Sequence, residues 1–126
     1  MEKEIIFSKE VPAPIGPYSQ AVRVANTYYF SGMIALDAQS GDMIGTDAAS
    51  QTKKAMENIG ALLAVKGLNY ANIAKTSIFL KDMDDFSAVN QCYSSYFKDH
   101  FPARETVQVS RLPKDALVEI TIIAVG

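Results

Sequence analysis

The chain is organised around one stretch of nine residues, Phe101-Pro102-Ala103-Arg104-Glu105-Thr106-Val107-Gln108-Val109. Pro102 cannot continue a helix, because its ring clashes with the preceding turn and its nitrogen carries no hydrogen. From Thr106 to Val109 the chain alternates and contains β-branched residues, as strands do. The stretch therefore predicts a helix that ends before Pro102 and a strand with Arg104 at its mouth.

Two interpretations fit Arg104. A rigid strand end is a good mount for a planar guanidinium, which can bind a carboxylate through two parallel hydrogen bonds. A surface arginine in an ordinary structural ion pair would look the same in the sequence, and such pairs are common. The neighbouring Glu105 need not neutralise Arg104, because successive strand side chains point to opposite faces. It could do so if the strand begins later.

Size and composition predict one globular domain over residues 1–126. Hydrophobic residues make up 48% of the chain, and the formal net charge is −2. No basic run or cluster stands out, which argues against nucleic acid as a partner, because phosphate binding relies on Lys and Arg. Cys92 is the only cysteine and His100 the only histidine, so an intramolecular disulfide and a multi-histidine metal site are excluded.

We therefore expect a protein without metal or cofactor. The N-terminus is charged and unlike a signal peptide. No apolar run approaches the roughly 18 residues of a membrane-spanning helix. These features predict a cytoplasmic protein that does not contact a membrane.

The order of elements predicts an α+β fold. The expected elements are strands at 5–7, 20–25 and 28–31, a brief strand at 43–45, a helix from Thr46 or Asp47 to Gly67, a strand at 72–80, a helix over 86–97, and strands at 106–109 and 117–125. Asn26 is expected to supply the positive φ of the first hairpin turn. Gly60, inside the first helix, is expected to allow close packing on the sheet.

The last strand, Leu117 to Val125, is apolar on both faces and should lie in the middle of the sheet. Two helices of these lengths can cover only one face of such a sheet. Something else must cover the other face, and a second copy of the same chain is the simplest candidate. We therefore expect a homo-oligomer whose subunits pack through their sheets.

Glu119 is the one acid in this apolar strand. Burial raises the pKa of a carboxyl group, and a group of that kind suits a general base near neutral pH. The alternative is a glutamate at an exposed edge, paired with a lysine. Because a short turn at Leu112-Pro113 joins the last two long strands, Arg104 and Glu119 are expected to face one another across or near that strand pair. Together they would form a hydrolytic site for an acid substrate.

Three further positions have both a functional and a structural interpretation. Tyr18 stands in a stiff, proline-rich loop at 11–19 and either lines a cleft or plugs the edge of the core. Gly32 follows a strand and either allows close approach of a ligand or another backbone, or marks a simple bulge. Asn90 adjoins the aromatic stripe of the second helix, where a structural hydrogen bond is the simpler interpretation. The stripe itself is assigned to the core.

Five sequence motifs follow one another along the chain: Ile15 to Ala21, Ser31-Gly32, Asp82 to Phe86 with Val89-Asn90, Phe101 to Arg104, and Arg111 to Ile120. In this order and spacing they resemble the reactive intermediate deaminases, also called the Rid or YjgF family. The resemblance implies a chorismate-mutase-like two-layer fold and a homotrimer with sheets facing inward and clefts between subunits. It also implies hydrolysis of 2-iminobutanoate and 2-iminopropanoate to 2-ketoacids and ammonia, which protects pyridoxal-phosphate enzymes.

The resemblance assigns roles to individual residues. It implies that Arg104 binds the substrate carboxylate and that Glu119 positions or activates water. The implied ligand-contacting residues of the cleft are Tyr18, Ser31, Gly32, Asn90 and Thr106, with Ser31, Gly32 and Thr106 acting through backbone groups.

The chain departs from the family pattern at three positions. Met33 and Ala35 stand where many members have Gln and Pro, and Glu105 stands where Ser is frequent. These departures bear on substrate breadth more than on the reaction. Two other functions stay open: a ribonuclease or translation inhibitor, and a ligand-binding or chaperone-like protein without turnover.

Overall fold

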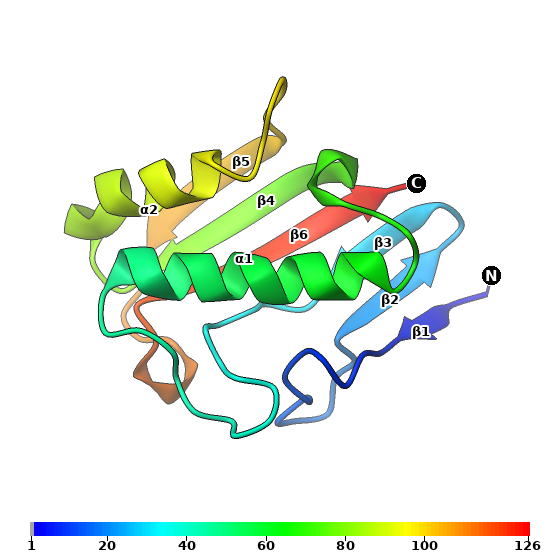
Figure 1. Cartoon of the computed structure of the whole chain (residues 1–126), viewed down its shortest axis with the longest axis horizontal. Helices are drawn as coiled ribbons and strands as arrows, with labels where there is room; N and C mark the ends of the chain where they lie inside the picture. Colours follow the sequence, from blue (N-terminus) through cyan, green and yellow to red (C-terminus); the bar gives the residue numbers. More distant parts are fainter. Residues whose placement is uncertain (1) are drawn as a thin grey trace.

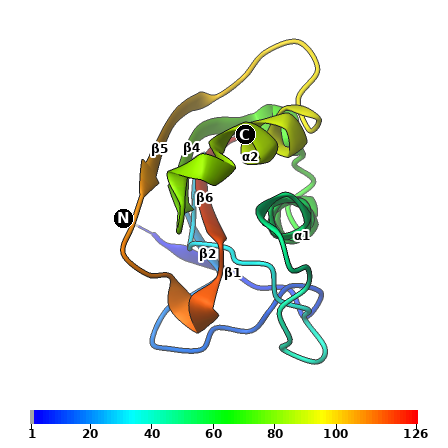
Figure 2. The ribbon, with the colours of Figure 1, turned by 90° about the vertical axis from the view of Figure 1, so that its left-hand side faces the viewer.

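The computed structural model describes residues 2–126 and shows a two-layer α+β fold (Figure 1). The strands are β1 (Glu4–Ile6), β2 (Ala21–Val24), β3 (Thr27–Phe30), β4 (Ile73–Leu80), β5 (Ala103–Gln108) and β6 (Val118–Val125). The helices are α1 (Ala48–Ala64) and α2 (Phe86–Ser94), with short 3-10 turns η1 (Tyr70–Asn72), η2 (Met83–Asp85) and η3 (Pro113–Asp115). Both helices lie on the same face of the sheet, as the sequence predicts (Figure 2).

All six strands form one sheet in the order β1-β2-β3-β6-β4-β5. The pairs are antiparallel except β4 with β5, which run parallel. The last strand, β6, therefore lies in the interior of the sheet, as expected. One feature differs from the prediction: β5 and β6 are not neighbours, because β4 lies between them.

The helix α1 begins and ends where the sequence places it. The side chain of Asp47 accepts a hydrogen bond from the backbone N–H of Ser50, which satisfies one of the free donors at the helix start. After the last turn, Gly67 takes a φ of 71°, and the N–H of Leu68 donates to the carbonyl of Leu63 at 3.1 Å. This is the turn that glycine favours beyond a helix.

The alternation of side chains along β6 separates the two faces of the sheet. Its helix-facing residues are fully buried in the main core: Val118, Ile120, Ile122 and Ala124. Glu119 and Ile123 point to the opposite face, which no helix covers in residues 2–126 (Figure 2). On that open face Ile5 is 55% exposed and Tyr29 46%. Its cover by a second copy stays a prediction.

Four local predictions are wrong. In the first hairpin turn Ala25 has the positive φ, at 56°, and the expected residue Asn26 does not. The expected brief strand at 43–45 is a single bridge between Leu36 and Met43. The second helix ends at Ser94, three residues before the predicted end, and turns and bends follow it toward Pro102. β5 also begins three residues earlier than predicted, so Arg104 lies inside the strand.

Gly60 does not provide close packing on the sheet. The hydroxyl of Tyr70 lies over it and donates a hydrogen bond to the carbonyl of Met56 at 2.8 Å. A Cβ atom at position 60 would lie 2.8 Å from Cζ of Tyr70, which is closer than side chains approach. The glycine therefore makes room for an aromatic ring that joins η1 to α1.

We expect Gly60→Ala to lower the free energy of unfolding by about 1 kcal/mol net, because displacing Tyr70 from its hydrogen bond to Met56 leaves polar groups unpaired and costs about 1 to 3 kcal/mol, more than the helix gains from alanine. Alanine otherwise stabilises a helix by up to about 1 kcal/mol relative to glycine. In a Tyr70→Leu background, where no hydroxyl reaches the site, the same substitution should be neutral or stabilising. Urea denaturation of the four proteins measures the difference. An equal cost in both backgrounds would contradict this role of Tyr70.

Candidate active site

Arg104 projects from β5 toward α2. Its register partner on β4 is Thr76, whose side chain faces the helices. One guanidinium nitrogen, Nη1, donates to Oδ1 of Asn90 at 2.7 Å. Asn90 therefore has the structural hydrogen bond that its position suggested, and that bond holds the arginine.

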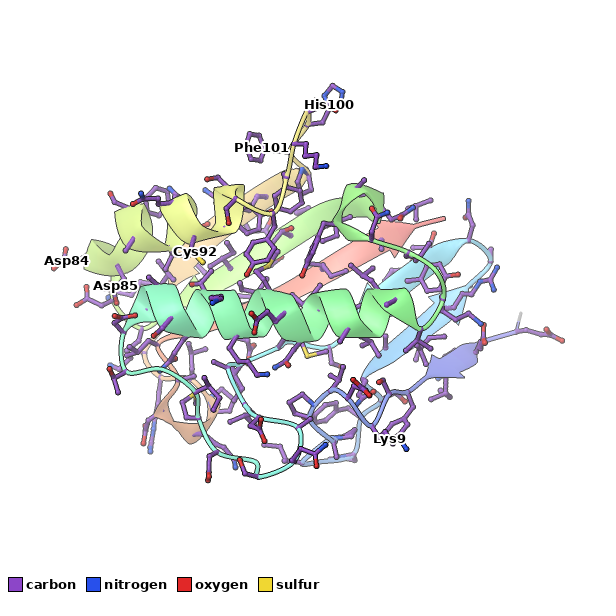
Figure 3. The ribbon with its side chains drawn as sticks, viewed as in Figure 1. Lys9, Asp84, Asp85, Cys92, His100 and Phe101 are labelled. Carbon is purple, nitrogen blue, oxygen red and sulfur yellow. The ribbon has the colours of Figure 1, made fainter. Side chains whose placement is uncertain are left out.

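The positive charge of Arg104 is available to a ligand. Within residues 2–126 no carboxylate lies within ion-pair distance of it, so the surface ion-pair interpretation is wrong for the single chain. The guanidinium borders a cleft of about 340 Å³ whose lining is Asn90, Tyr93, Ser94, Phe101, Pro102 and Arg104. Figure 3 shows Phe101 and His100 on the segment that joins α2 to β5.

Glu119 occupies the opposite face of the sheet. It lies on β6 beside Phe79 of β4, and in the part of the chain that the structure describes no cation or hydrogen-bond donor reaches its carboxylate. Gly32 makes room for it, because a Cβ there would lie 2.7 Å from Cδ of Glu119. The close approach expected at Gly32 is therefore that of a carboxylate side chain of the same chain.

Burial raises the pKa of Glu119 above the ordinary value of a carboxyl group. The cause is loss of hydration, and no neighbouring charge offsets it. A half-buried carboxylate with a raised pKa, whose oxygens accept no hydrogen bond from the described residues, can act as a general base toward water. The interpretation of Glu119 as an edge residue paired with lysine does not hold, since β6 is an interior strand.

A pocket of about 330 Å³ opens beside Glu119. Its lining is mainly apolar: Pro12, Ala13, Ile15, Tyr18, Gln20, Ser31, Gly32, Met33, Ile34, Leu36, Pro113 and Glu119. Tyr18 lines this pocket, and its hydroxyl accepts a hydrogen bond from the backbone N–H of Ile15 at 3.3 Å. Tyr18 is thus a cleft residue and does not plug the core.

Gln20 fixes this pocket wall and was not identified from the sequence. Its amide nitrogen donates to the carbonyls of Val11 at 3.2 Å and Pro12 at 3.0 Å, and its oxygen accepts from the N–H of Ser8 at 2.7 Å. Nearby, the hydroxyl of Ser31 donates to the carbonyl of Ser19 at 2.6 Å. The proline-rich loop is therefore tied to β2 and β3, but a lone glutamine gives no sequence signal for partners so far along the chain.

Arg104 and Glu119 do not face one another within one chain. Arg104 stands opposite Thr76 of β4 on the helix-covered face, whereas Glu119 stands opposite Phe79 on the open face. The two residues are therefore separated by β4 and point to opposite sides of the sheet. The expected contact across a strand pair is wrong, because the turn at Leu112-Pro113 does not connect neighbouring strands.

The structure separates Glu105 from Arg104. Glu105 lies on the open face, where it pairs with Nζ of Lys75 at 2.9 Å and accepts a hydrogen bond from Ser77. These contacts, that of Ser77 first, lower the pKa of Glu105. Thr106 returns to the helix-covered side, and its Oγ1 is buried with no partner in residues 2–126. Glu105 therefore does not neutralise the arginine.

Residues 2–126 lack two other kinds of feature. No group of three or more His, Cys, Asp or Glu side chains is placed to hold a metal ion. No helix is both long and apolar enough to cross a membrane.

Comparison with known proteins places these features in a family. A family model described as endoribonuclease L-PSP matches residues 8–126. A RutC family protein of Pyrococcus abyssi is 45% identical over 98% of each chain. The human 2-iminobutanoate/2-iminopropanoate deaminase is 42% identical over 98% of this chain and 90% of its own length.

The fold also matches that of solved structures. The Escherichia coli protein TdcF, solved with bound serine, superimposes with a TM-score of 0.92 at 36% identity and covers 98% of both chains. Sequence and fold agree over nearly the whole length. The chain therefore belongs to the endoribonuclease L-PSP family, the Rid or YjgF family that its motifs resemble.

Proposed function

We propose that this protein is an enzyme that hydrolyses reactive 2-imino acids, such as 2-iminobutanoate and 2-iminopropanoate, to 2-ketoacids and ammonia. The observation that carries the proposal is the pair of unneutralised groups: Arg104, held by a neutral amide, and Glu119, half-buried without a donor. Arg104 can bind the carboxylate of a substrate, and Glu119 can position and deprotonate a water molecule. The name of the human relative and the serine bound to TdcF support a small substrate with a carboxylate.

The chemistry needs only these two groups and water. Arg104 binds the carboxylate through two hydrogen bonds and fixes the plane of the protonated imine. Glu119 orients a water molecule and accepts its proton as the oxygen attacks carbon 2. The carbinolamine then collapses: protonated Glu119 returns its proton to the nitrogen, the C–N bond breaks, and ammonia leaves. The hydroxyl proton passes to water, so that the 2-ketoacid remains and Glu119 is again a carboxylate. A positioned base of this kind contributes about 10²- to 10⁴-fold to the rate.

The proposal places each site between two copies of the chain. A single chain offers the two groups on opposite faces of its sheet, so one substrate cannot touch both. A neighbouring copy that covers the open face could bring its Arg104 to the pocket beside Glu119. The family resemblance favours three copies. A cytoplasmic location and protection of pyridoxal-phosphate enzymes belong to the same proposal.

Ribonuclease activity is the second candidate, because the matching family model carries that description. The charges argue against it: Arg104 is the only lysine or arginine that lines either cleft. Binding of RNA relies on several such residues. Cleavage of RNA that survives repurification and is lost in Glu119→Gln would favour this candidate. Binding of 2-ketoacids without release of ammonia would instead favour a binding protein.

Arg104→Lys should lower kcat/KM for 2-iminobutanoate by about 10- to 100-fold, and Arg104→Ala by more, because lysine keeps the charge but cannot form two parallel hydrogen bonds. The assay couples threonine dehydratase to this protein and follows 2-ketobutyrate. Arg23→Lys is the matched control, because Arg23 pairs with Glu4 at the far edge of the sheet. Wild-type rates in Arg104→Ala would remove the assignment.

The pH dependence should report Glu119. Since burial raises its pKa, kcat/KM should rise with pH along a limb centred above the ordinary carboxyl value, and Glu119→Gln should abolish that limb. A limb that persists in Glu119→Gln would assign the base elsewhere.

The same shift has a consequence for stability. A raised folded-state pKa stabilises the protein below the unfolded-state value, and this contribution is lost as pH rises through the folded-state pKa. Glu119→Gln should therefore gain stability relative to wild type between about pH 4 and pH 7. Urea denaturation at both values measures the change, and a difference that is constant with pH would contradict the burial of a charged Glu119.

A further inference from the structure

Two aromatic rings of α2 lie beside the guanidinium of Arg104. Its carbon Cζ lies 5.7 Å from the ring centre of Phe86 and 5.3 Å from that of Tyr93. The two residues are seven positions apart, so they share one side of the helix. They belong to the aromatic stripe that the sequence assigns to the core without any chemistry. Phe86, however, is 37% exposed. A residue that only packs in the core would not need this exposure.

A hydrogen bond to the sheet holds the ring of Tyr93 in place. Only 3% of Tyr93 is exposed, and its hydroxyl donates to Oγ1 of Thr76 at 2.9 Å. Thr76 is the register partner of Arg104 on β4. The same position of the sheet therefore fixes both the arginine and the ring beside it. Burial also raises the pKa of Tyr93, so its hydroxyl stays protonated and remains a donor.

Asn90 completes the arrangement. It lies on α2 between Phe86 and Tyr93, close to one turn from each, and accepts the hydrogen bond from Nη1 of Arg104. Two rings and one amide therefore restrict the guanidinium, and none of the three is charged. Its other N–H groups have no protein acceptor in residues 2–126. A carboxylate can approach this remaining edge.

We propose that Phe86 and Tyr93, here called the aromatic clamp, are positioning residues for the proposed imine hydrolysis. The rings attract the cation through their faces and order it before the substrate arrives. Ordering in advance lowers the entropy lost on binding and fixes the plane of the bound carboxylate. The inference rests on the proposed function and adds to it a reason why a planar guanidinium is needed: an ammonium group has no plane for the rings to hold.

The clamp predicts weaker carboxylate binding when either ring is removed. Phe86→Leu and Tyr93→Leu should each raise the Kd of 2-ketobutyrate, the unreactive product, by about 2- to 30-fold. They should also raise KM and lower kcat for the imine, since the carboxylate is held less well in plane. Tyr93→Phe keeps the ring and should show a smaller effect. Tyr96→Leu is the matched control, because Tyr96 packs on Tyr70 and does not contact Arg104.

A double-mutant cycle separates positioning from general damage to the fold. If the rings act through the guanidinium, Arg104→Lys should cost much less in a Phe86→Leu background than in the wild type. Costs that simply multiply would mean that Phe86 acts independently of Arg104, and would overturn the clamp. Because Tyr93 is buried, Phe86→Leu and Tyr93→Phe keep the test decisive if Tyr93→Leu does not fold.

NMR of the Arg104 Nε–H group tests the clamp without turnover. In the wild type its resonance should be displaced by ring currents and should exchange slowly with water, and both properties should weaken in Phe86→Leu. If the wild type is active but the leucine variants keep its Arg104 resonance and its Kd for 2-ketobutyrate, the aromatic clamp is overturned. The proposed function is not affected by that result. A wild type that neither hydrolyses the imine nor binds 2-ketobutyrate would overturn the proposed function, while the displaced resonance would still show that the rings hold Arg104.

Discussion

The position of β4 between β5 and β6 is the constraint on which the candidate site depends. Strand pleating sends alternate side chains to opposite faces, and the register on β4 puts Arg104 and Glu119 out of phase. The chain therefore carries a cation under its helices and an acid on its bare face. Neither group can neutralise the other within one chain, so both stay available for ligands.

Each group is prepared by its own surroundings. The arginine is ordered by Asn90 without loss of charge. The Glu119 side chain is half-buried beside an apolar pocket, in space that is free because Gly32 has no side chain. Half-buried unpaired charge is unfavourable for folding and is seldom kept without a use. The proposed contact between copies of the chain would bring the two charges to one substrate and cover the apolar residues of the open face.

The sequence predicts much of this structure where local rules decide. The limits of α1 follow from the Asp47 cap and Gly67, and the buried face of β6 follows from its alternation. Its predictions fail where distant partners decide. Nothing near Leu112 shows that the chain crosses to a strand beyond β4, because strand order depends on pairing between remote segments. Helical spacing likewise cannot distinguish a core aromatic from Phe86, whose ring faces a guanidinium.

The most direct test of a site shared between copies is complementation of two inactive variants. Arg104→Ala and Glu119→Gln are co-expressed in equal amounts, purified together, and assayed for release of 2-ketobutyrate from 2-iminobutanoate. In a shared site, random mixing joins an intact Arg104 to an intact Glu119 of another copy in about a quarter of the interfaces, and that fraction of wild-type activity should return. If the mixture stays as inactive as its components, although the copies do assemble with one another, the two residues do not act from different subunits.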